Sequence, residues 1–175
     1  MNGGMRTVIA LCLALLPASA YAVNVEPGSL WGSFGLGPGF KLGTELGGSK
    51  AYALLDGDVN YSFTENLSVD GELTLGLANT IPWRWRLGGR YRFSDLKMPV
   101  SPYVLAQFST GVLFDVIGAN LWVVGGRFGG GVDYFLTGEI GVGAQLTFDL
   151  GSTLGQRPAF YGTTEILAYA SYRFR

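Results

Sequence analysis

The sequence contains no histidine, and this absence weighs against most enzyme mechanisms that need a base near neutral pH. A serine nucleophile would lack its usual proton acceptor, and no lysine stands in an obvious inward position beside a serine on a predicted strand. The single cysteine, Cys12, lies in an N-terminal apolar run and follows Leu11, where a lipoprotein-processing site would have a small residue. We therefore expect no enzyme, no disulfide, no metal site and no cofactor.

Long apolar runs are also absent beyond the N-terminal region. No later stretch approaches the roughly 20 apolar residues that a transmembrane helix needs, which excludes a helical membrane protein. Residues 1–22 have the order of a cleavable secretory signal, because Arg6 gives a positive start, residues 8–16 are apolar, and small residues precede a cut after Ala22. Residues 23–175 have the length of a single domain.

Neither sign of charge dominates the chain. It carries 12 basic and 13 acidic residues, and loss of Arg6 with the expected signal leaves a net charge of about minus two. This balance gives no reason to expect a nucleic-acid partner.

What the sequence does have is alternation with a period of two. Residues 83–93 show it best, because as a strand they place aromatic and apolar side chains on one face and four arginines on the other. The apolar face holds Trp83, Trp85, Leu87, Tyr91 and Phe93, and the other holds Arg84, Arg86, Arg90 and Arg92. Seven more segments have this period, near residues 30–42, 51–63, 67–77, 104–114, 124–134, 140–148 and 159–174. Most of them reach the roughly 9 to 11 residues that a tilted strand needs to cross a membrane.

A soluble β-sandwich would alternate in the same way, with its apolar face as the core and its arginines pointing at water. Strands in soluble proteins average about 5 to 6 residues, however, which is about half the length found here. The even-numbered segments also end alike in aromatic residues, as an interfacial girdle requires. The expected girdle residues are Tyr61, Phe63, Trp83, Trp85, Tyr91, Phe93, Tyr134, Tyr172 and Phe174. These features favour a closed barrel.

The polar faces of neighbouring segments carry opposite charges, as a closed interior demands. An eight-stranded barrel is only wide enough for side chains to fill it, so we expect these charges to pair as a plug. Rearrangement of that plug could open a narrow ion path. The expected lumen charge network is Asp56, Asp58, Asp70, Glu72, Arg84, Arg86, Arg90, Arg92, Arg127, Asp133, Asp149, Glu165 and Arg173. Carboxylates two residues apart could instead bind a hard cation or do acid–base work, but the nearby arginines favour neutralisation.

The connection between the third and fourth segments predicts which charges face one another. We expect the loop to end at Pro82, since proline cannot donate to a ladder. Facing residue numbers then sum to about 162, which sets Glu72 against Arg90 and Asp70 against Arg92. A register shifted by two would set Asp70 against Arg90.

With these residues in place, the chain resembles the eight-stranded outer-membrane β-barrel family, meaning small barrels like the transmembrane domain of outer-membrane protein A. The resemblance covers residues 29–175 and rests on the export signal, the strand count, the glycine-rich pattern in residues 129–135 and 141–144, and the aromatic end of the last strand. It implies an all-β fold, a closed antiparallel up-and-down eight-stranded transmembrane β-barrel, without the peptidoglycan-binding domain that follows some such barrels. The chain departs from the family at its end, where Arg175 follows Phe174, because the family usually ends on an aromatic residue that the barrel-assembly machinery reads.

The resemblance also implies a location and partners. We expect a Gram-negative outer membrane reached through the periplasm, contact with outer-membrane lipid, passage through the secretion and barrel-assembly machinery, and a monomer. An even strand count places both mature termini and a tight turn at residues 64–66 on the periplasmic side. The function we expect is a structural or narrow-pore, porin-like barrel with a charge-paired lumen. The alternative is a binding protein that takes a small apolar or surface ligand at the barrel mouth.

Overall fold

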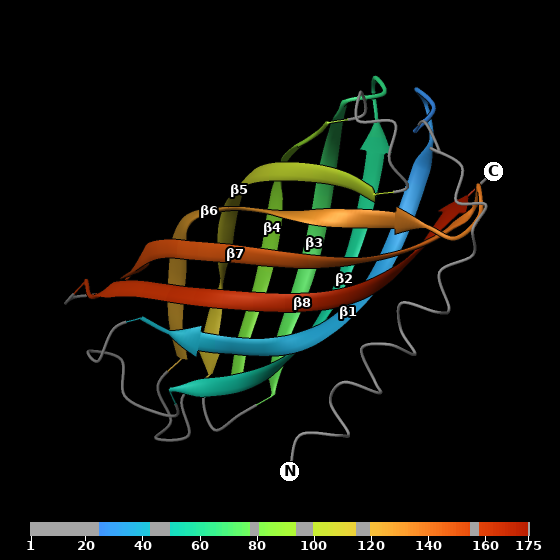
Figure 1. The fold of residues 1–175 in the computed structure, drawn as a ribbon. Coiled ribbons are helices and arrows are strands. Elements are labelled where there is room, and N and C mark those ends of the chain that lie inside the picture. The colour runs from blue at the N-terminus through green and yellow to red at the C-terminus, as the bar shows by residue number, and fades with distance from the viewer. Residues whose placement is uncertain are drawn as a thin grey trace, which may run out of the picture.

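The computed structural model describes residues 25–42, 50–77, 81–93, 100–114, 120–154 and 158–174. Its strands are β1 (Leu30–Lys41), β2 (Ala51–Ser62), β3 (Leu67–Leu77), β4 (Ile81–Arg92), β5 (Val100–Phe114), β6 (Asn120–Phe135), β7 (Ile140–Leu154) and β8 (Phe160–Phe174). Each strand pairs antiparallel with its neighbours in sequence, and β1 pairs with β8, so that the sheet closes on itself (Figure 1). The predicted all-β, closed, up-and-down barrel of eight strands is confirmed, and a two-sheet sandwich is excluded.

Several expectations fall outside the described residues. These are the secretory signal at residues 1–22, with Cys12, and the terminal Arg175. In the part of the chain that the structure describes, no helix is long and apolar enough to cross a membrane.

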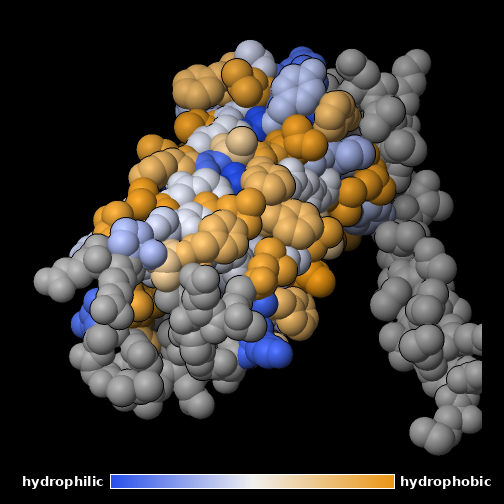
Figure 2. Space-filling model, turned by 90° about the vertical axis from the view of Figure 1, so that its left-hand side faces the viewer, coloured by the Kyte–Doolittle hydropathy of each residue, from blue (hydrophilic) through white to orange (hydrophobic). Residues whose placement is uncertain are grey.

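Side chains alternate between the lumen and the outer wall, as the period of two predicts. Along β2, Val59 is 53% exposed and the next residue, Asn60, is 1% exposed. Along β4, Trp85 is 43% exposed and Arg86 is 3% exposed. Apolar side chains therefore cover much of the outer wall (Figure 2), and the charged side chains lie inside, which is the arrangement that a barrel in lipid requires.

Glycines on the inner face make room for two tyrosines that enter the lumen. Tyr103 lies directly opposite Gly131, and Tyr169 lies directly opposite Gly143. A Cβ at either glycine would lie 2.6 Å or less from the facing tyrosine ring or hydroxyl, so a larger residue would clash with the tyrosine at both positions. The tyrosine rings fill the space that the missing side chains leave.

Two described turns at one end of the barrel share the same chemistry. In the β2–β3 turn, the Thr64 hydroxyl accepts hydrogen bonds from the N–H groups of Asn66 and Leu67, at 3.3 and 2.9 Å. In the β6–β7 turn, the Thr137 hydroxyl accepts the equivalent pair at 3.2 and 3.0 Å. β1 begins and β8 ends at this same end (Figure 1), which we call the turn end; the opposite end is the loop end. The tight turn at residues 64–66 is confirmed, whereas the side of the membrane that it faces stays a prediction.

The register between β3 and β4 differs from both predicted alternatives. Glu72 lies opposite Arg86, and Asp70 lies opposite a glycine. The facing pairs that set Glu72 against Arg90 and Asp70 against Arg92 are therefore wrong, and so is the alternative of Asp70 facing Arg90. In the observed ladder, each β3 residue faces a β4 residue that lies nearer the start of β4 than either prediction placed it.

The prediction assumed that a proline ends a loop, but in this barrel prolines lie inside strands. Pro82, which we expected at a loop end, is the second residue of β4 and pairs with Leu113 of β5. Room for its ring comes from Gly76 on β3, where a Cβ would lie 2.2 Å from the proline Cδ. In β1 the ladder to β8 has no pair at Gly37 or Pro38, while the ladder to β2 is continuous. A proline that lacks an N–H thus interrupts one ladder without ending its strand.

Candidate functional site

The lumen holds nearly all of the charges that alternation predicts there. Each expected network residue except Arg173 is at most 7% exposed, although all of them are ionisable. They come from β2, β3, β4, β6, β7 and β8. Buried charges persist when they are paired and hydrogen-bonded, so the arrangement of partners determines what this interior can do.

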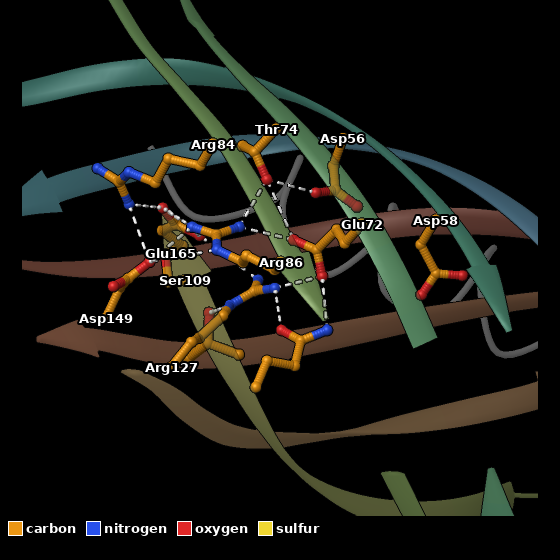
Figure 3. A network of polar contacts seen from close by, with 12 residues as sticks. Asp56, Asp58, Glu72, Thr74, Arg84, Arg86, Ser109, Arg127, Asp149 and Glu165 are labelled. Carbon is orange, nitrogen blue, oxygen red and sulfur yellow. Dashed lines mark hydrogen bonds and ion pairs between the residues drawn. The ribbon is translucent and has the colours of Figure 1, made fainter. Parts of the chain in front are cut away.

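The middle of the lumen is occupied by a set of ion pairs that we call the central cluster: Arg84, Arg86, Arg127, Glu72, Asp149 and Glu165. Arg86 contacts Glu72 at 2.6 Å, Asp149 at 3.0 Å and Glu165 at 2.9 Å. Arg84 contacts the latter two at 3.3 and 2.8 Å, as Figure 3 shows. Three arginines and three carboxylates therefore share their partners instead of forming isolated pairs.

Arg127 ties the central cluster to the wall formed by β6 and β7. It forms ion pairs with Glu72 and, at 3.4 Å, with Glu165. Its Nε donates to the Thr147 hydroxyl at 2.9 Å. Its Nη1 also donates to the side-chain oxygen of Gln107 at 3.0 Å, whereas its Nη2 has the ion pair with Glu165 but no hydrogen-bond partner among the described residues.

Neutral polar side chains complete the central cluster, and the sequence reasoning did not identify them. Ser109 donates to Asp149 at 2.8 Å, Arg84 donates to the Thr163 hydroxyl at 3.1 Å, and Gln107 donates to Glu72 at 3.4 Å. The available signal was their position, since each lies on the same strand face as the predicted charges. Their hydrogen bonds satisfy carboxylate lone pairs and a guanidinium N–H that the ion pairs leave open.

Asp56 is the expected network residue with the weakest link to a cation. It has no ion pair within the described residues and accepts a hydrogen bond from the Thr74 hydroxyl at 2.8 Å (Figure 3). The lumen holds the five arginines of the network against seven carboxylates, which is a formal excess of two negative charges. The interior is therefore more attractive to cations than to anions.

Nearer the turn end lies a second group that we call the rim cluster: Arg90, Arg92, Asp58, Asp70 and Asp133. Arg90 contacts Asp58 at 2.8 Å and Asp70 at 3.8 Å, and Arg92 contacts Asp133 at 3.2 Å. Arg90 thus reaches Asp70 diagonally, although the two do not face each other in the ladder.

Two tyrosines join the rim cluster to the opposite wall. Tyr169 donates to Asp133 at 2.6 Å and to the Tyr103 hydroxyl at 3.0 Å. The Tyr103 hydroxyl in turn donates to the side-chain oxygen of Gln145 at 2.7 Å. The Arg90 guanidinium lies 4.5 Å from the centre of the Tyr103 ring, within cation–π range. Sequence analysis missed both tyrosines, although each sits at an inward position of its strand.

The rim cluster surrounds a cavity of about 10 Å³, which is room for a single water molecule. Asp58, Arg90, Asp133 and Tyr169 are among the residues that line it. The Nε of Arg90 is buried and has no hydrogen-bond partner among the described residues. The rim cluster therefore lies beside unfilled space, and guanidinium nitrogens that lack a hydrogen-bond partner in the described part of the chain also occur in the central cluster, at Arg84 Nε and Arg127 Nη2.

Apolar side chains close the lumen beyond the charges. Near the loop end, Leu113, Val123 and Tyr161 are each 3% exposed and pack together. At the turn end, Trp31 and Phe135 pack together with Val25, and each of the three is at most 5% exposed. Apolar contacts thus flank the polar interior toward both ends.

Arg173 is the one expected network residue that lies elsewhere. It forms an ion pair with Glu26 at the turn end, and its side chain is 20% exposed. Alternation assigns it to the inner face correctly, but its place at the end of β8 takes it beyond the buried part of the lumen.

The expected girdle residues divide between the two halves of the barrel. At the turn end, Tyr and Phe rings lie edge to face on three strands, with centroids 5.1 to 5.5 Å apart. These pairs are Tyr61–Phe63, Tyr91–Phe93 and Tyr172–Phe174. Tyr134 is half-buried at the same end. Trp83 instead lies toward the loop end, where it packs edge-on against Phe114 at 5.7 Å, and Trp85 is two residues nearer the middle of β4.

Comparisons with known proteins agree with this architecture. A family model for the outer membrane protein beta-barrel domain matches residues 8–174. The structure of Neisserial surface protein A is similar at a TM-score of 0.68 and 17% identity, over 83% of this chain and 97% of that one. The N-terminal β-barrel domain of Pseudomonas aeruginosa OprF is similar at a TM-score of 0.63 and 14% identity, over 86% of this chain and 100% of that one. Ail, the attachment invasion locus protein of Yersinia pestis, is similar at a TM-score of 0.57 and 13% identity, over 85% of this chain and 99% of that one. These identities show a shared fold alone, and no curated protein sequence matches the chain.

Proposed function

The chain belongs to the outer membrane protein β-barrel domain family, and from this premise we propose that it is a structural barrel whose lumen is closed at rest by ion pairs. We propose that it acts without catalysis, as a monomer in contact with outer-membrane lipid. Export through the periplasm, with the turn end facing that compartment, belongs to the same proposal.

The observation that carries the proposal is the reach of the central cluster across the lumen. Arg86 on β4 contacts both Asp149 on β7 and Glu165 on β8. In the closed strand order, β4 and β8 lie on opposite sides of the barrel. Their side chains therefore meet in the space that an open pore would need, and an eight-stranded barrel has little such space.

The packing at the two ends supports the same conclusion. Apolar groups flank the charges toward both mouths, with Tyr161 in the loop-end group and Trp31 in the turn-end group. An aqueous path would need both the charges and these apolar groups to rearrange together. If such a path formed, the two excess carboxylates would favour cations over anions.

Conductance of the purified barrel in a planar lipid bilayer tests the proposal. We expect no discrete current steps from the natural chain, because the central cluster occupies the path. The double substitution Arg84→Ala with Arg86→Ala should produce steps that favour cations. Trp85→Ala is the matched control, since it truncates a large side chain on the same strand but on the lipid face. Regular steps from the natural chain at rest would contradict the closed lumen and support the narrow-pore alternative.

A further inference from the structure

The segment that precedes β1 crosses the mouth of the barrel at the turn end. Val25 is 3% exposed and packs against Trp31 and Phe135, whose rings lie 5.5 Å apart. Trp31 belongs to β1 and Phe135 to β6, and these strands are not neighbours in the barrel. The Trp31 indole N–H also donates to the Ser29 hydroxyl at 3.2 Å. The segment thus places an apolar side chain between separate parts of the rim.

Two further attachments hold this segment in place. The Gly28 N–H donates to the Ser62 carbonyl oxygen at 2.7 Å. Gly28 has a φ of 83°, a conformation that glycine adopts at no steric cost and that turns the chain toward the mouth. Glu26 forms an ion pair with Arg173 at the end of β8. Its side chain is 69% exposed, so solvent weakens this attachment.

The space under this segment is the small cavity of the rim cluster. Trp31 and Phe135, which hold Val25, are also walls of that cavity, together with Arg90 and Asp133. Removing Val25 from its seat would therefore uncover the cavity and the charges of the rim cluster that line it. Among the described residues of the loop end, the apolar group differs in kind, because Leu113, Val123 and Tyr161 pack as parts of the strands β5, β6 and β8.

We propose that residues 25–29 form a releasable clasp that closes the lumen at the turn end. When the clasp is seated, Val25 separates the rim cluster from solvent. When it is released, water and small ions reach Arg90, Asp58 and Asp133 while the strands stay paired. The segment is suited to release because it is held by one buried side chain, one exposed ion pair and a few hydrogen bonds, and it does not belong to the sheet.

A cysteine reporter in the cavity wall tests the clasp in the full barrel. Ser171 is half-buried and lines the cavity, so Ser171→Cys, in a Cys12→Ser background, marks entry of a small cationic methanethiosulfonate reagent. Because Ser171 is partly exposed, the reporter has a basal rate while the clasp is seated, and the test is the change in that rate. We expect Val25→Asp to raise the rate of modification, measured by mass spectrometry in micelles, at least about tenfold, which corresponds to about 1.4 kcal/mol of clasp stability.

A matched substitution controls for a general effect of charge at this end. Leu136 lies in the β6–β7 turn and is 45% exposed, so Leu136→Asp makes the same kind of change outside the clasp and should leave the reporter rate unaltered. A reporter at the exposed Thr64 should react equally fast in every variant. Equal Ser171→Cys rates with and without Val25→Asp would overturn the proposal, and so would equal acceleration by Leu136→Asp.

Charge exchange gives a second route that does not depend on a buried acid. Glu26→Arg should speed modification of the Ser171→Cys reporter, because it places two cations beside each other. Adding Arg173→Glu should restore the slow rate by re-forming the ion pair with opposite polarity. Failure of Glu26→Arg to speed the reaction, or of the second substitution to slow it again, would show that residues 25–29 do not control access.

Discussion

The central cluster and the rim cluster contain the same kinds of residues but differ in how completely each charge is surrounded. Arg86 in the central cluster contacts three carboxylates at 3.0 Å or less. Arg92 in the rim cluster has one carboxylate partner, Asp133, at 3.2 Å, and completes its contacts with Asn60 and Ser68 at 3.1 to 3.4 Å. Beside the rim cluster lies a cavity, and a few residues further along β4 the ion pairs of the central cluster cross the lumen.

The difference shows that position along the barrel axis, rather than residue type, determines the environment of a buried charge. Carboxylates from both sides of the barrel converge on the central arginines, because β7 and β8 each supply one there. Toward the turn end those two strands supply Gln145 and Tyr169 in place of carboxylates. The rim cluster therefore depends on neutral partners, and we expect substitutions in it to lower the free energy of unfolding less than substitutions in the central cluster.

The largest expected effect is that of Arg86→Ala. This substitution leaves three buried carboxylates short of a cation, and removing one partner of a buried ion pair costs about 3–5 kcal/mol. The free energy of unfolding in urea, followed by heat-modifiable migration on gels, measures the loss. A cost below that of Arg92→Ala would contradict the ranking of the two clusters.

A double-mutant cycle sharpens the comparison, because it distinguishes side chains that contact each other from side chains that do not. We expect Arg86→Ala and Glu72→Ala to couple by about 2 kcal/mol, because the two side chains are in contact, whereas Arg90→Ala and Glu72→Ala should be additive within about 0.5 kcal/mol. The same unfolding measurement on the single and double variants gives both coupling energies. Strong coupling between positions 90 and 72 would join the two clusters into one network.

The smallest expected effect is that of Arg92→Ala. Asp133 keeps its hydrogen bond from Tyr169 at 2.6 Å, and the neighbouring cavity offers room for water, so we expect a loss of about 1–2 kcal/mol in the free energy of unfolding. Arg92→Lys, which keeps the charge, should recover part of it. A loss as large as that of Arg86→Ala would show that the rim is as dry and rigid as the centre.

The sequence alone predicts the barrel and the face of most side chains, because both follow from a period of two and from strand length. The position of Arg127 in the lumen, for example, follows from its alternation with Phe128, which is 50% exposed on the outer wall. Phe135 also follows this alternation. It comes one residue after Tyr134 and so lies on the other face of the strand, whereas Phe63 comes two residues after Tyr61 and so lies on the same face. That parity explains why Phe135 enters the lumen while Phe63 faces outward.

The partners within the lumen could not be predicted from the sequence in the same way. Which carboxylate meets Arg84 depends on the stagger of β4 relative to β7 and β8, and no local pattern encodes that stagger. The β3–β4 register depends on whether Pro82 lies in a loop or in a strand, which Gly76 decides from across the ladder. The division into a central and a rim cluster is therefore a property of the closed barrel.

The cross-lumen ion pairs also have a consequence for the order of folding. Arg84 and Glu165 are 81 residues apart in the chain, and Arg127 and Glu72 are 55 apart. Contacts between such distant residues form late, since the intervening chain must first be organised. Glu165 on β8 is shared by Arg84, Arg86 and Arg127, so the central cluster is completed only when β8 arrives and the seam between β1 and β8 closes. Closure of the barrel and completion of the central cluster therefore coincide, so a chain that stops before β8 would be left with an open sheet and with a central cluster that lacks Glu165.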